Sequence, residues 1–372
     1  MKKPDKKRIV TFPRMGNINI PVSGMLKAMG ANILLPPPNN AETLNYGVKN
    51  SVEGVCIPYK LNLGNYIQAL EAGANVLLMF NAPGTCRLGN YAQMAEAKLR
   101  ELGYDFEMVI FDMYKGKLAE ISRKFSYATG NTSILKTLYG IKLGFAKFDA
   151  LDAIERMLFY SRPREINPGK AEKIYKSGIV LIDNAMTIKE VNEALKLTMN
   201  KYKSLQLDKN KEVLKIHITG EFFVLLDPFT NMEIEKELGL LGVEVERQIM
   251  LSDWTNNALL PKWFSKKESH RDRAYRIAGD YIKRAVGGEC METIGDAVYA
   301  ADAEVDGVVH LGPFTCNPEI VSQCILPNVS KKENIPVLSL IIDEHQGRAG
   351  FITRLEAFVD LMYRRKLSKK TA

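Results

Sequence analysis

Short apolar runs alternate with longer amphipathic stretches in the first part of the chain. The runs typical of strands are residues 8–12, 31–35, 75–80 and 108–112. A further strand is expected to end near Cys56. The stretches with helical periodicity between them are residues 21–29, 63–72 and 90–102. Strands separated by single helices predict a parallel sheet covered by helices.

The middle of the chain has a different pattern. At residues 117–205 the apolar positions recur at helical spacing, and only residues 178–182 look like a strand. A second α/β series then begins, with expected strands at 211–219, 243–248, 307–311 and 337–342. Its expected helices are residues 232–241, 272–285 and 292–301 and the stretch after Cys316.

The pattern therefore predicts an α/β fold with two Rossmann-like parallel-sheet domains and a cleft between them. We place the N-terminal domain at residues 1–116 and the C-terminal domain at 206–372, joined by a mainly helical segment at 117–205. The length of 372 residues is sufficient for two cores.

Composition narrows the class of protein. Hydrophobic residues make up 46% and charged residues 25%, as in ordinary globular proteins. No apolar run approaches the roughly 20 residues that cross a bilayer, and residues 9–12 are too short for a signal-peptide core. We therefore expect a cytoplasmic protein without a membrane partner. The net charge is +8, but the basic residues cluster only at the two termini and are otherwise spread along the chain. This distribution favours a solvated surface or a small anionic ligand over nucleic acid.

Three cysteines share one local setting. Cys56, Cys86 and Cys316 each lie in a turn rich in glycine or proline that precedes a helix-like stretch. Helix N-termini favour a thiolate, and three thiolates in one crevice would bind a soft metal. The alternative is that each is a small buried hydrophobe, the usual fate of a free cysteine. Turns of this composition are poor places to bury one.

The two remaining cysteines have different contexts. Cys290 follows Gly287, Gly288 and Glu289 before a predicted helix and is a candidate fourth ligand, whereas Cys324 is expected to pack in the core. A structural zinc site takes four ligands, while a cubane held by three thiolates keeps one iron open. No Cys-x-x-Cys pair is present, and disulfides are not expected in a reducing compartment.

Other ionisable residues are weaker candidates. Glu221 and Glu344 follow predicted strands and are speculative acid–base groups, with a helix cap or a surface turn as the alternative for each. His217 and His310 lie in apolar runs and are expected to be hydrogen-bonded core residues. His270 lies in a charged stretch and is expected to be solvated. No dinucleotide or P-loop motif is present.

Several motifs carry a resemblance to a known family. They are residues 12–17, 56–65, 84–91 (Gly-Thr-Cys-Arg-Leu-Gly-Asn-Tyr), 220–222, 313–321 (beginning Pro-Phe-Thr-Cys-Asn-Pro) and 354–360. In their order and spacing the chain resembles the 2-hydroxyacyl-CoA dehydratase subunit family and its relatives, the acyl-CoA dehydratase activase-related or CoA protein activase proteins. The resemblance extends from residue 12 onward.

The resemblance implies a [4Fe-4S] cluster held by three cysteines, which map onto Cys56, Cys86 and Cys316. It also implies an ATP-dependent activator protein that supplies a low-potential electron, a related dehydratase-like subunit, and a small-molecule substrate at the open iron. A double cubane takes six cysteines in such relatives and this chain has five. It could contribute to a double cubane only together with a partner chain, so we expect a single cubane. Where relatives have Gly-Gly-His-Gly, this chain has Gly287-Gly288-Glu289-Cys290. The resemblance therefore places Cys290 outside the family's set of cluster ligands. If Cys290 closed the cluster here, the protein would act as an electron relay.

Three hypotheses follow for function. The first is an iron-sulfur protein that performs electron transfer or reductive chemistry on an acyl-CoA or other small substrate. The second is a non-catalytic assembly or regulatory protein with a structural metal, which predicts a closed site that includes Cys290. The third is a small-molecule binding protein without a cluster, whose cysteines are simply packed.

Overall fold

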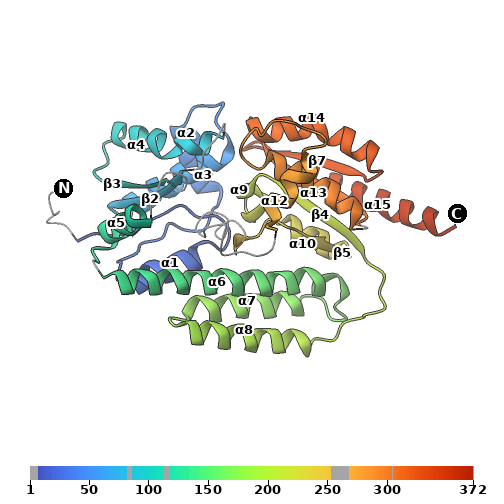
Figure 1. Ribbon diagram of the computed structural model, residues 1–372, viewed down its shortest axis with the longest axis horizontal. Helices are drawn as coiled ribbons and strands as arrows, with labels where there is room; N and C mark the ends of the chain where they lie inside the picture. The colour runs from blue at the N-terminus through green and yellow to red at the C-terminus, as the bar shows by residue number, and fades with distance from the viewer. Residues whose placement is uncertain are drawn as a thin grey trace.

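The computed structural model describes residues 7–81, 86–112, 118–131, 133–252, 268–303 and 305–371. Two parallel β-sheets lie side by side, each accompanied by helices, and a layer of long helices lies below both in the view of Figure 1. The predicted α/β class with two parallel sheets is therefore confirmed.

The first sheet has three parallel strands in the order β1-β2-β3. They are β1 (Val10–Thr11), β2 (Val76–Asn81) and β3 (Glu107–Asp112). Its accompanying helices are α1 (Asn19–Ala28), α2 (Ala41–Asn50), α3 (Ile57–Glu71) and α4 (Tyr91–Glu101). Val10 also forms a parallel bridge with Ile33, so the segment around Ile33 borders β1 on the side away from β2.

The second sheet has four parallel strands in the order β5-β4-β6-β7. They are β4 (Leu214–Gly220), β5 (Val243–Glu246), β6 (Gly307–Pro313) and β7 (Val337–Ile342). Its helices are α9 (Phe222–Leu226), α10 (Ile234–Leu240), α12 (His270–Ala278), α13 (Cys290–Asp302), α14 (Asn317–Lys332) and α15 (Arg348–Thr371). When the Ile33 segment is counted as a strand, both sheets have the same strand order. In each, the second segment along the chain (Ile33 or β5) forms the edge next to the first strand (β1 or β4), and the later strands follow on the other side.

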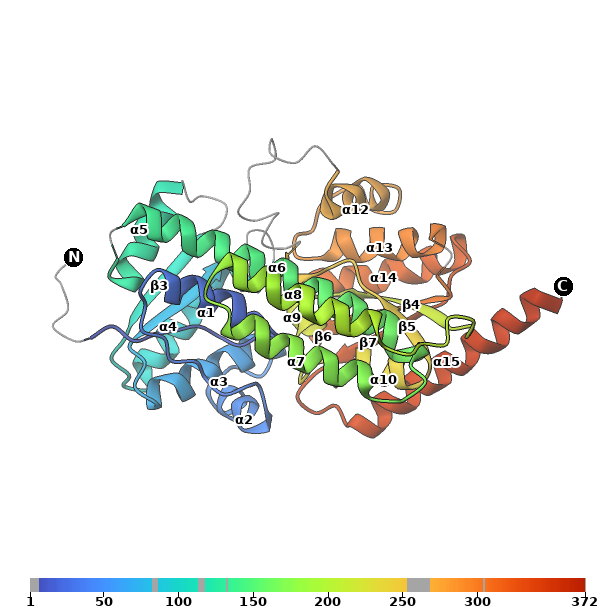
Figure 2. The same cartoon turned by 90° about the horizontal axis from the view of Figure 1, so that it is seen from below.

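The middle of the chain is helical, as predicted. Its elements are α5 (Leu118–Thr129), α6 (Ile134–Ser161), α7 (Lys170–Asn184) and α8 (Ile188–Lys203). A capping box between Thr187 and Glu190 begins α8. Helices α6, α7 and α8 run alongside one another beneath the two sheets, and α6 packs on α1 (Figures 1 and 2).

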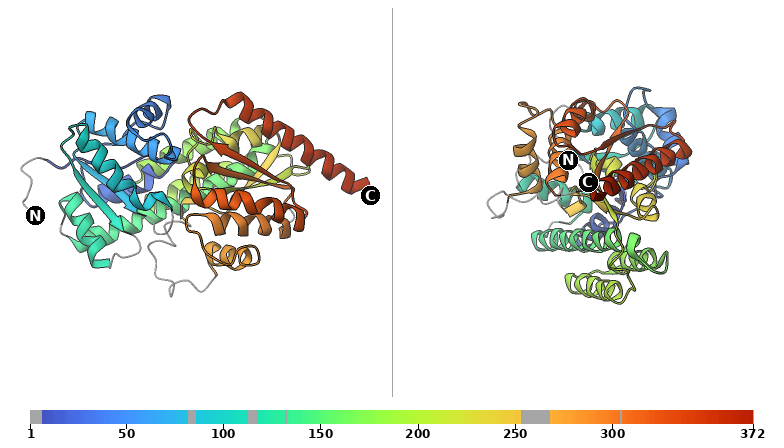
Figure 3. Two further views of the ribbon diagram at one scale, coloured as in Figure 1. Left: turned by 90° about the horizontal axis from the view of Figure 1, so that it is seen from above. Right: turned by 90° about the vertical axis from the view of Figure 1, so that its right-hand side faces the viewer.

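A continuous apolar cluster joins the two halves. It extends from Val10 and Val76 of the first sheet to Ile216 and Val309 of the second. Helix α15 begins beside the second sheet and its C-terminal end extends beyond it (Figures 2 and 3). None of the described helices is both long and apolar enough to cross a membrane.

Some predicted elements differ from the structure. Residues 178–182 are part of α7, because Gly178 packs on Thr198 of α8 and the alternating Val180 faces solvent. No strand ends near Cys56, which instead precedes α3 after a turn. Residues 31–35 form only the single bridge at Ile33 rather than a full strand.

Candidate functional site

The carboxyl ends of the inner strands carry the candidate residues. In the first sheet the Ile33 segment lies on one side of β1 and β2 on the other; in the second sheet β5 lies on one side of β4 and β6 on the other. The direction of the connections therefore reverses between β1 and β2 and between β4 and β6, and each of these places is a topological switch point. Open parallel sheets bind ligands beside such points. Arg14 follows β1, Cys86 follows β2, Glu221 follows β4 and Cys316 follows β6.

These segments line one cavity of about 580 Å³. Cys56, Cys86 and Cys316 all contribute to its wall, so the structure brings the three predicted thiols to one space. Within the described part of the chain, no three His, Cys, Asp or Glu side chains surround a single point closely enough to hold one metal ion. The three thiols thus share a cavity without forming a closed ligand group.

Each of the three cysteines immediately precedes a helix. Cys56 is the N-cap of α3, Cys316 is the N-cap of α14, and Cys86 precedes a short 3₁₀ helix (Arg87–Asn90). Both α3 and α14 carry proline in their first turn, where its missing N–H is harmless. The free N–H groups of α3 and α14 favour negative charge on the neighbouring sulfur.

Arg87 connects the three loops that carry the cysteines. Its Nη1 donates to the carbonyl of Gly54 at 2.8 Å, and its Nη2 donates to the hydroxyl of Thr315 at 2.9 Å and to the Thr315 carbonyl. The Thr315 hydroxyl also donates to the Gly54 carbonyl at 3.1 Å. Thr315 has a φ of 65°, a conformation that costs free energy in a residue other than glycine. This network positions the three cysteine loops together.

Burial controls the protonation of the thiols. It raises the pKa of Cys86 to about 12 and raises the pKa values of Cys56 and Cys316 as well. Cys56 also shares a hydrogen bond with the hydroxyl of Tyr91, which partly opposes the shift in its pKa. The thiols are therefore protonated at neutral pH unless a cation in the cavity compensates their charge.

Three carboxyl groups line the same cavity. Burial raises the pKa of Glu221 and of Glu292 to about 7, and it raises the pKa of Glu289 well above the ordinary value. Glu221 accepts a hydrogen bond from the backbone N–H of Val224 at 2.9 Å and so also caps α9. A carboxyl group with a pKa near neutrality can both accept and donate a proton.

The sequence interpretation missed several residues of this cavity. Arg14, Tyr91, Glu289 and Glu292 all belong to its wall. Glu289 lies in the glycine-rich turn at residues 287–290, which the sequence analysis considered only for Cys290. In the structure Glu289, and not Cys290, lines the cavity. For Arg14 the signals were its place after a predicted strand and its position in the motif at residues 12–17.

Cys290 itself lies outside the shared cavity. Its side chain is fully buried and packs with Ala278 and Ile294 beneath α13. Burial raises its pKa to about 11, while the Ser322 hydroxyl provides a hydrogen bond. The candidate fourth ligand thus lies in an apolar core, where its thiol has Ser322 of α14 as a hydrogen-bond partner.

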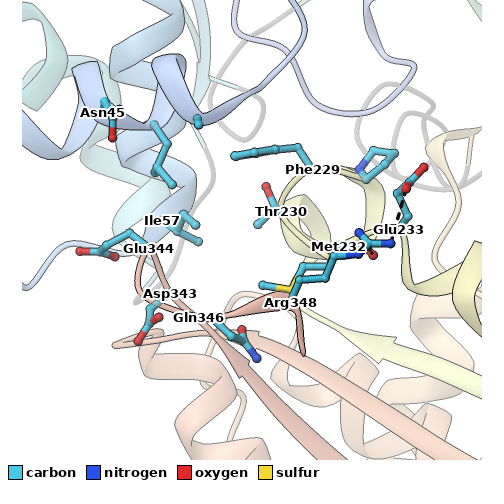
Figure 4. A pocket seen from close by; sticks show the side chains of 13 residues that line it. Asn45, Ile57, Phe229, Thr230, Met232, Glu233, Asp343, Glu344, Gln346 and Arg348 are labelled. Atoms are coloured by element: carbon cyan, nitrogen blue, oxygen red, sulfur yellow. Dashed lines mark hydrogen bonds and ion pairs between the residues drawn. The ribbon is translucent and has the colours of Figure 1, made fainter. Parts of the chain in front are cut away.

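Glu344 lies apart from the cysteines. It forms an ion pair with Lys60 of α3, which joins the loop after β7 to the first half of the chain. The pair outweighs the effect of burial and lowers the pKa of Glu344. A second cavity, of about 620 Å³, includes Glu344 but no cysteine; Figure 4 shows Glu344 on one side of it and Arg348 on the other.

The structure also tests the secondary expectations. His310 is buried with hydrogen bonds to Glu319 at 2.9 Å and to Ser339 at 3.1 Å, as expected for a core histidine. The expectation for His270 was wrong, because its Nε2 lies 2.6 Å from Asp296 and its side chain is only 10% exposed.

Two further outcomes concern His217 and Cys324. His217 is buried as expected, but its Nε2 lies 3.9 Å from the Asp296 carboxylate, beyond hydrogen-bond distance. The expectation for Cys324 was wrong: it is exposed on α14, on the side of the helix where Ile320, one turn earlier, is also exposed.

Comparison with known proteins adds no assignment: neither a protein-family model nor a curated protein matches this chain.

Proposed function

We propose that this chain is an iron-sulfur protein of the 2-hydroxyacyl-CoA dehydratase type. In this proposal the two sheets are the cores of two Rossmann-like domains, and Cys56, Cys86 and Cys316 hold a [4Fe-4S] cluster in the cavity between them. The observation that carries the proposal is the Arg87 network, which ties together the three loops whose cysteines line one cavity.

The donor set and the cavity are compatible with a cluster. Three thiols that line a common space suit a multi-atom cluster better than one metal ion, whose ligands must converge within about 2.3 Å of a single point. The cationic irons would also offset the burial that now keeps the thiols protonated. The alternative of a closed structural metal site loses its fourth ligand, because Cys290 packs elsewhere.

A cluster with three thiolate ligands supplies low-potential electrons and an open iron for a small substrate. The residues of this chain would then manage protons and solvent. Glu221, with a pKa of about 7, can hold or release a proton beside the cysteines. Phe80, Phe222 and Phe223 line the cavity and restrict water around it.

The proposal includes partners that the chain would need. No P-loop motif is present in the sequence, so we assign ATP hydrolysis to a separate activator protein, and we expect a related dehydratase-like subunit. All five cysteines are free thiols, which fits the reducing cytoplasm that we propose as its location.

Anaerobic reconstitution tests the proposal. We expect the purified chain to take up about four irons and four sulfides and to show charge-transfer absorbance. Replacing Cys56, Cys86 or Cys316 by serine should abolish retention of iron and sulfide. Cys324→Ser is the matched control, since that thiol is exposed and does not belong to the cavity wall, and it should load like the parent chain. Zinc without sulfide in the parent chain would refute the cluster.

A further inference from the structure

The loop between β1 and α1 places Arg14 in the wall of the cysteine cavity. Its backbone N–H donates to Asn65 Oδ1 at 2.7 Å, and its carbonyl accepts from Asn39 Nδ2 at 3.3 Å. The side-chain Nε donates to the Pro36 carbonyl at 2.9 Å. The backbone of Arg14 is therefore held at two points and its side chain at Nε, in a residue that belongs to the cavity wall.

The same loop is locked against the second half of the chain. Gly16 has a φ of 49°, and a Cβ there would lie 2.1 Å from the Leu226 carbonyl oxygen. The N–H of Gly16 and the side chain of Asn39 both donate to Asp227 Oδ2, at 3.3 and 2.9 Å. Such a loop has little freedom, so the position of Arg14 is set before any ligand arrives.

The terminal nitrogens of Arg14 have no hydrogen bond or ion pair among the residues that the structure describes. Burial lowers the pKa of Arg14, and the charge of Asp183 acts on it only through space. Arginine nevertheless stays protonated at neutral pH. A partly desolvated cation that lines a cavity is best satisfied by an anion, and the planar guanidinium matches a carboxylate.

Asn62 provides a second unsatisfied polar group in the same wall. It lies on α3 between Cys56 and Asn65, the residue that holds Arg14, and it is only 6% exposed. Its Oδ1 is buried without a hydrogen-bond partner, and its amide makes no hydrogen bond to the described residues. Because buried amides are almost always paired, this one points to a ligand. Either amide atom can face that ligand, since their assignment can be exchanged.

We propose that Arg14 and Asn62 form a binding subsite for the carboxylate of a small organic acid. Arg14 would bind the carboxylate through two N–H groups, and Asn62 would donate a further hydrogen bond. The apolar part of the acid would contact Met15, Ile18 and Phe80, which line the same cavity. The inference rests on the proposed function in taking this acid as the substrate that is presented to the cysteine-bound cluster.

The charge of the cavity selects a monoanion over a dianion. The cavity wall is already acidic, with Glu221, Glu289 and Glu292, and each negative charge on a ligand must be desolvated there. The guanidinium of Arg14 can compensate one such charge, and a second would be buried without a cation beside it. Arg271 also lies in the wall, but it is engaged with Glu292 at 3.2 Å. A carboxylate is therefore favoured over inorganic phosphate.

Ligand-observed NMR titration of the full chain tests the subsite. The probes are propionate, the matched neutral compound propionamide, and inorganic phosphate. We expect propionate to bind and propionamide not to bind. Arg14→Gln should weaken propionate binding at least tenfold and Asn62→Leu severalfold, whereas Arg14→Lys should lose less than Arg14→Gln because it keeps the charge. Arg364→Gln is the matched control, since Arg364 is exposed on α15, and it should bind like the parent chain.

Thermal melting of each variant shows whether it is folded, and its iron and sulfide content is measured after reconstitution. Unchanged propionate binding in a folded Arg14→Gln chain, or tighter binding of phosphate than of propionate, would overturn the subsite. A chain that holds a cluster but binds no propionate refutes the subsite alone. A chain that binds propionate through Arg14 but holds no cluster refutes the proposed function alone.

Discussion

Burial sets the properties of single residues around the cavity and beyond it. In the cavity it acts on thiols and carboxyls with too few neighbouring cations, so the pKa values of Cys86 and Glu289 rise. At Asp296, which lies beside His217 of β4, the neighbouring groups outweigh burial instead. Burial alone would raise the pKa of Asp296, but the imidazoles of His217 and His270 outweigh it and lower the pKa to about 2.

Asp296→Asn tests this reversed balance. Because the pKa of Asp296 is lower in the folded chain than its reference value of 3.8, the charged carboxylate stabilises the fold above about pH 4, and this contribution is lost as pH falls toward 2. We expect the substitution to reduce the free energy of unfolding by about 2 kcal/mol at pH 7 and by less at pH 3, measured by urea denaturation. The exposed Asp302→Asn should change it by less than about 0.5 kcal/mol. An equal loss at both pH values would contradict the account.

The sequence allowed part of this site to be predicted. The three cysteines were identifiable because residue type and turn context act locally. The positions of Glu344 and Cys290 could not be predicted, since Lys60 and the core around Ile294 determine where those side chains lie. Such partners are distant in the sequence, and one sequence does not reveal them.

At the scale of elements, close approach of strands shapes the loops that carry the site. Gly220 ends β4 with a φ of 141° and directly precedes Glu221. A Cβ at Gly220 would lie 1.9 Å from the carbonyl oxygen of Leu311 in β6. Neither the backbone conformation nor the strand spacing accepts a side chain there.

Gly220→Ala should therefore lower the free energy of unfolding by more than about 2 kcal/mol, because β4 and β6 must separate or Glu221 must move. Gly350→Ala is the control: that exposed glycine of α15 has no atom within 4 Å of its would-be Cβ. We expect it to stabilise the chain by up to about 1 kcal/mol through helix propensity. Chemical denaturation measures both, and equal stability of the two variants would refute the steric argument.

Most strands and helices were predictable at this scale, because periodicity is a local property. The wrong prediction at residues 178–182 shows where local periodicity is insufficient. The apolar run in α7 is long enough to resemble a buried strand, and its packing against α6 and α8, which the sequence does not show, stabilises the helix. The missed helix α2 has few buried residues and therefore a weak apolar pattern.

In the whole molecule, two sheets of the same strand order direct the carboxyl ends of their inner strands to one cavity. The Lys60–Glu344 ion pair helps to hold the halves together, with side chains only 2% and 13% exposed. Removal of one partner would leave the other charge buried without its main partner, with only the Glu53 carbonyl at 3.2 Å from Lys60 Nζ or His345 at 3.9 Å from Glu344 beside it.

A double-mutant cycle tests this connection. Lys60→Met and Glu344→Gln should each cost about 3 kcal/mol of unfolding free energy, and the double variant should cost clearly less than their sum. The exposed pair Arg364 and Asp360 is the control, with an expected coupling below about 0.5 kcal/mol. Additive losses at Lys60 and Glu344 would show that the pair does not couple the halves.

The central claim is that the three cysteine loops hold one cluster. Its most direct test is anomalous X-ray scattering at the iron edge from anaerobically grown crystals of the reconstituted chain. We predict one iron density in the cavity, bonded to the sulfurs of Cys56, Cys86 and Cys316. Iron bound elsewhere, or a reconstituted iron-containing chain without density beside these three sulfurs, would contradict the account.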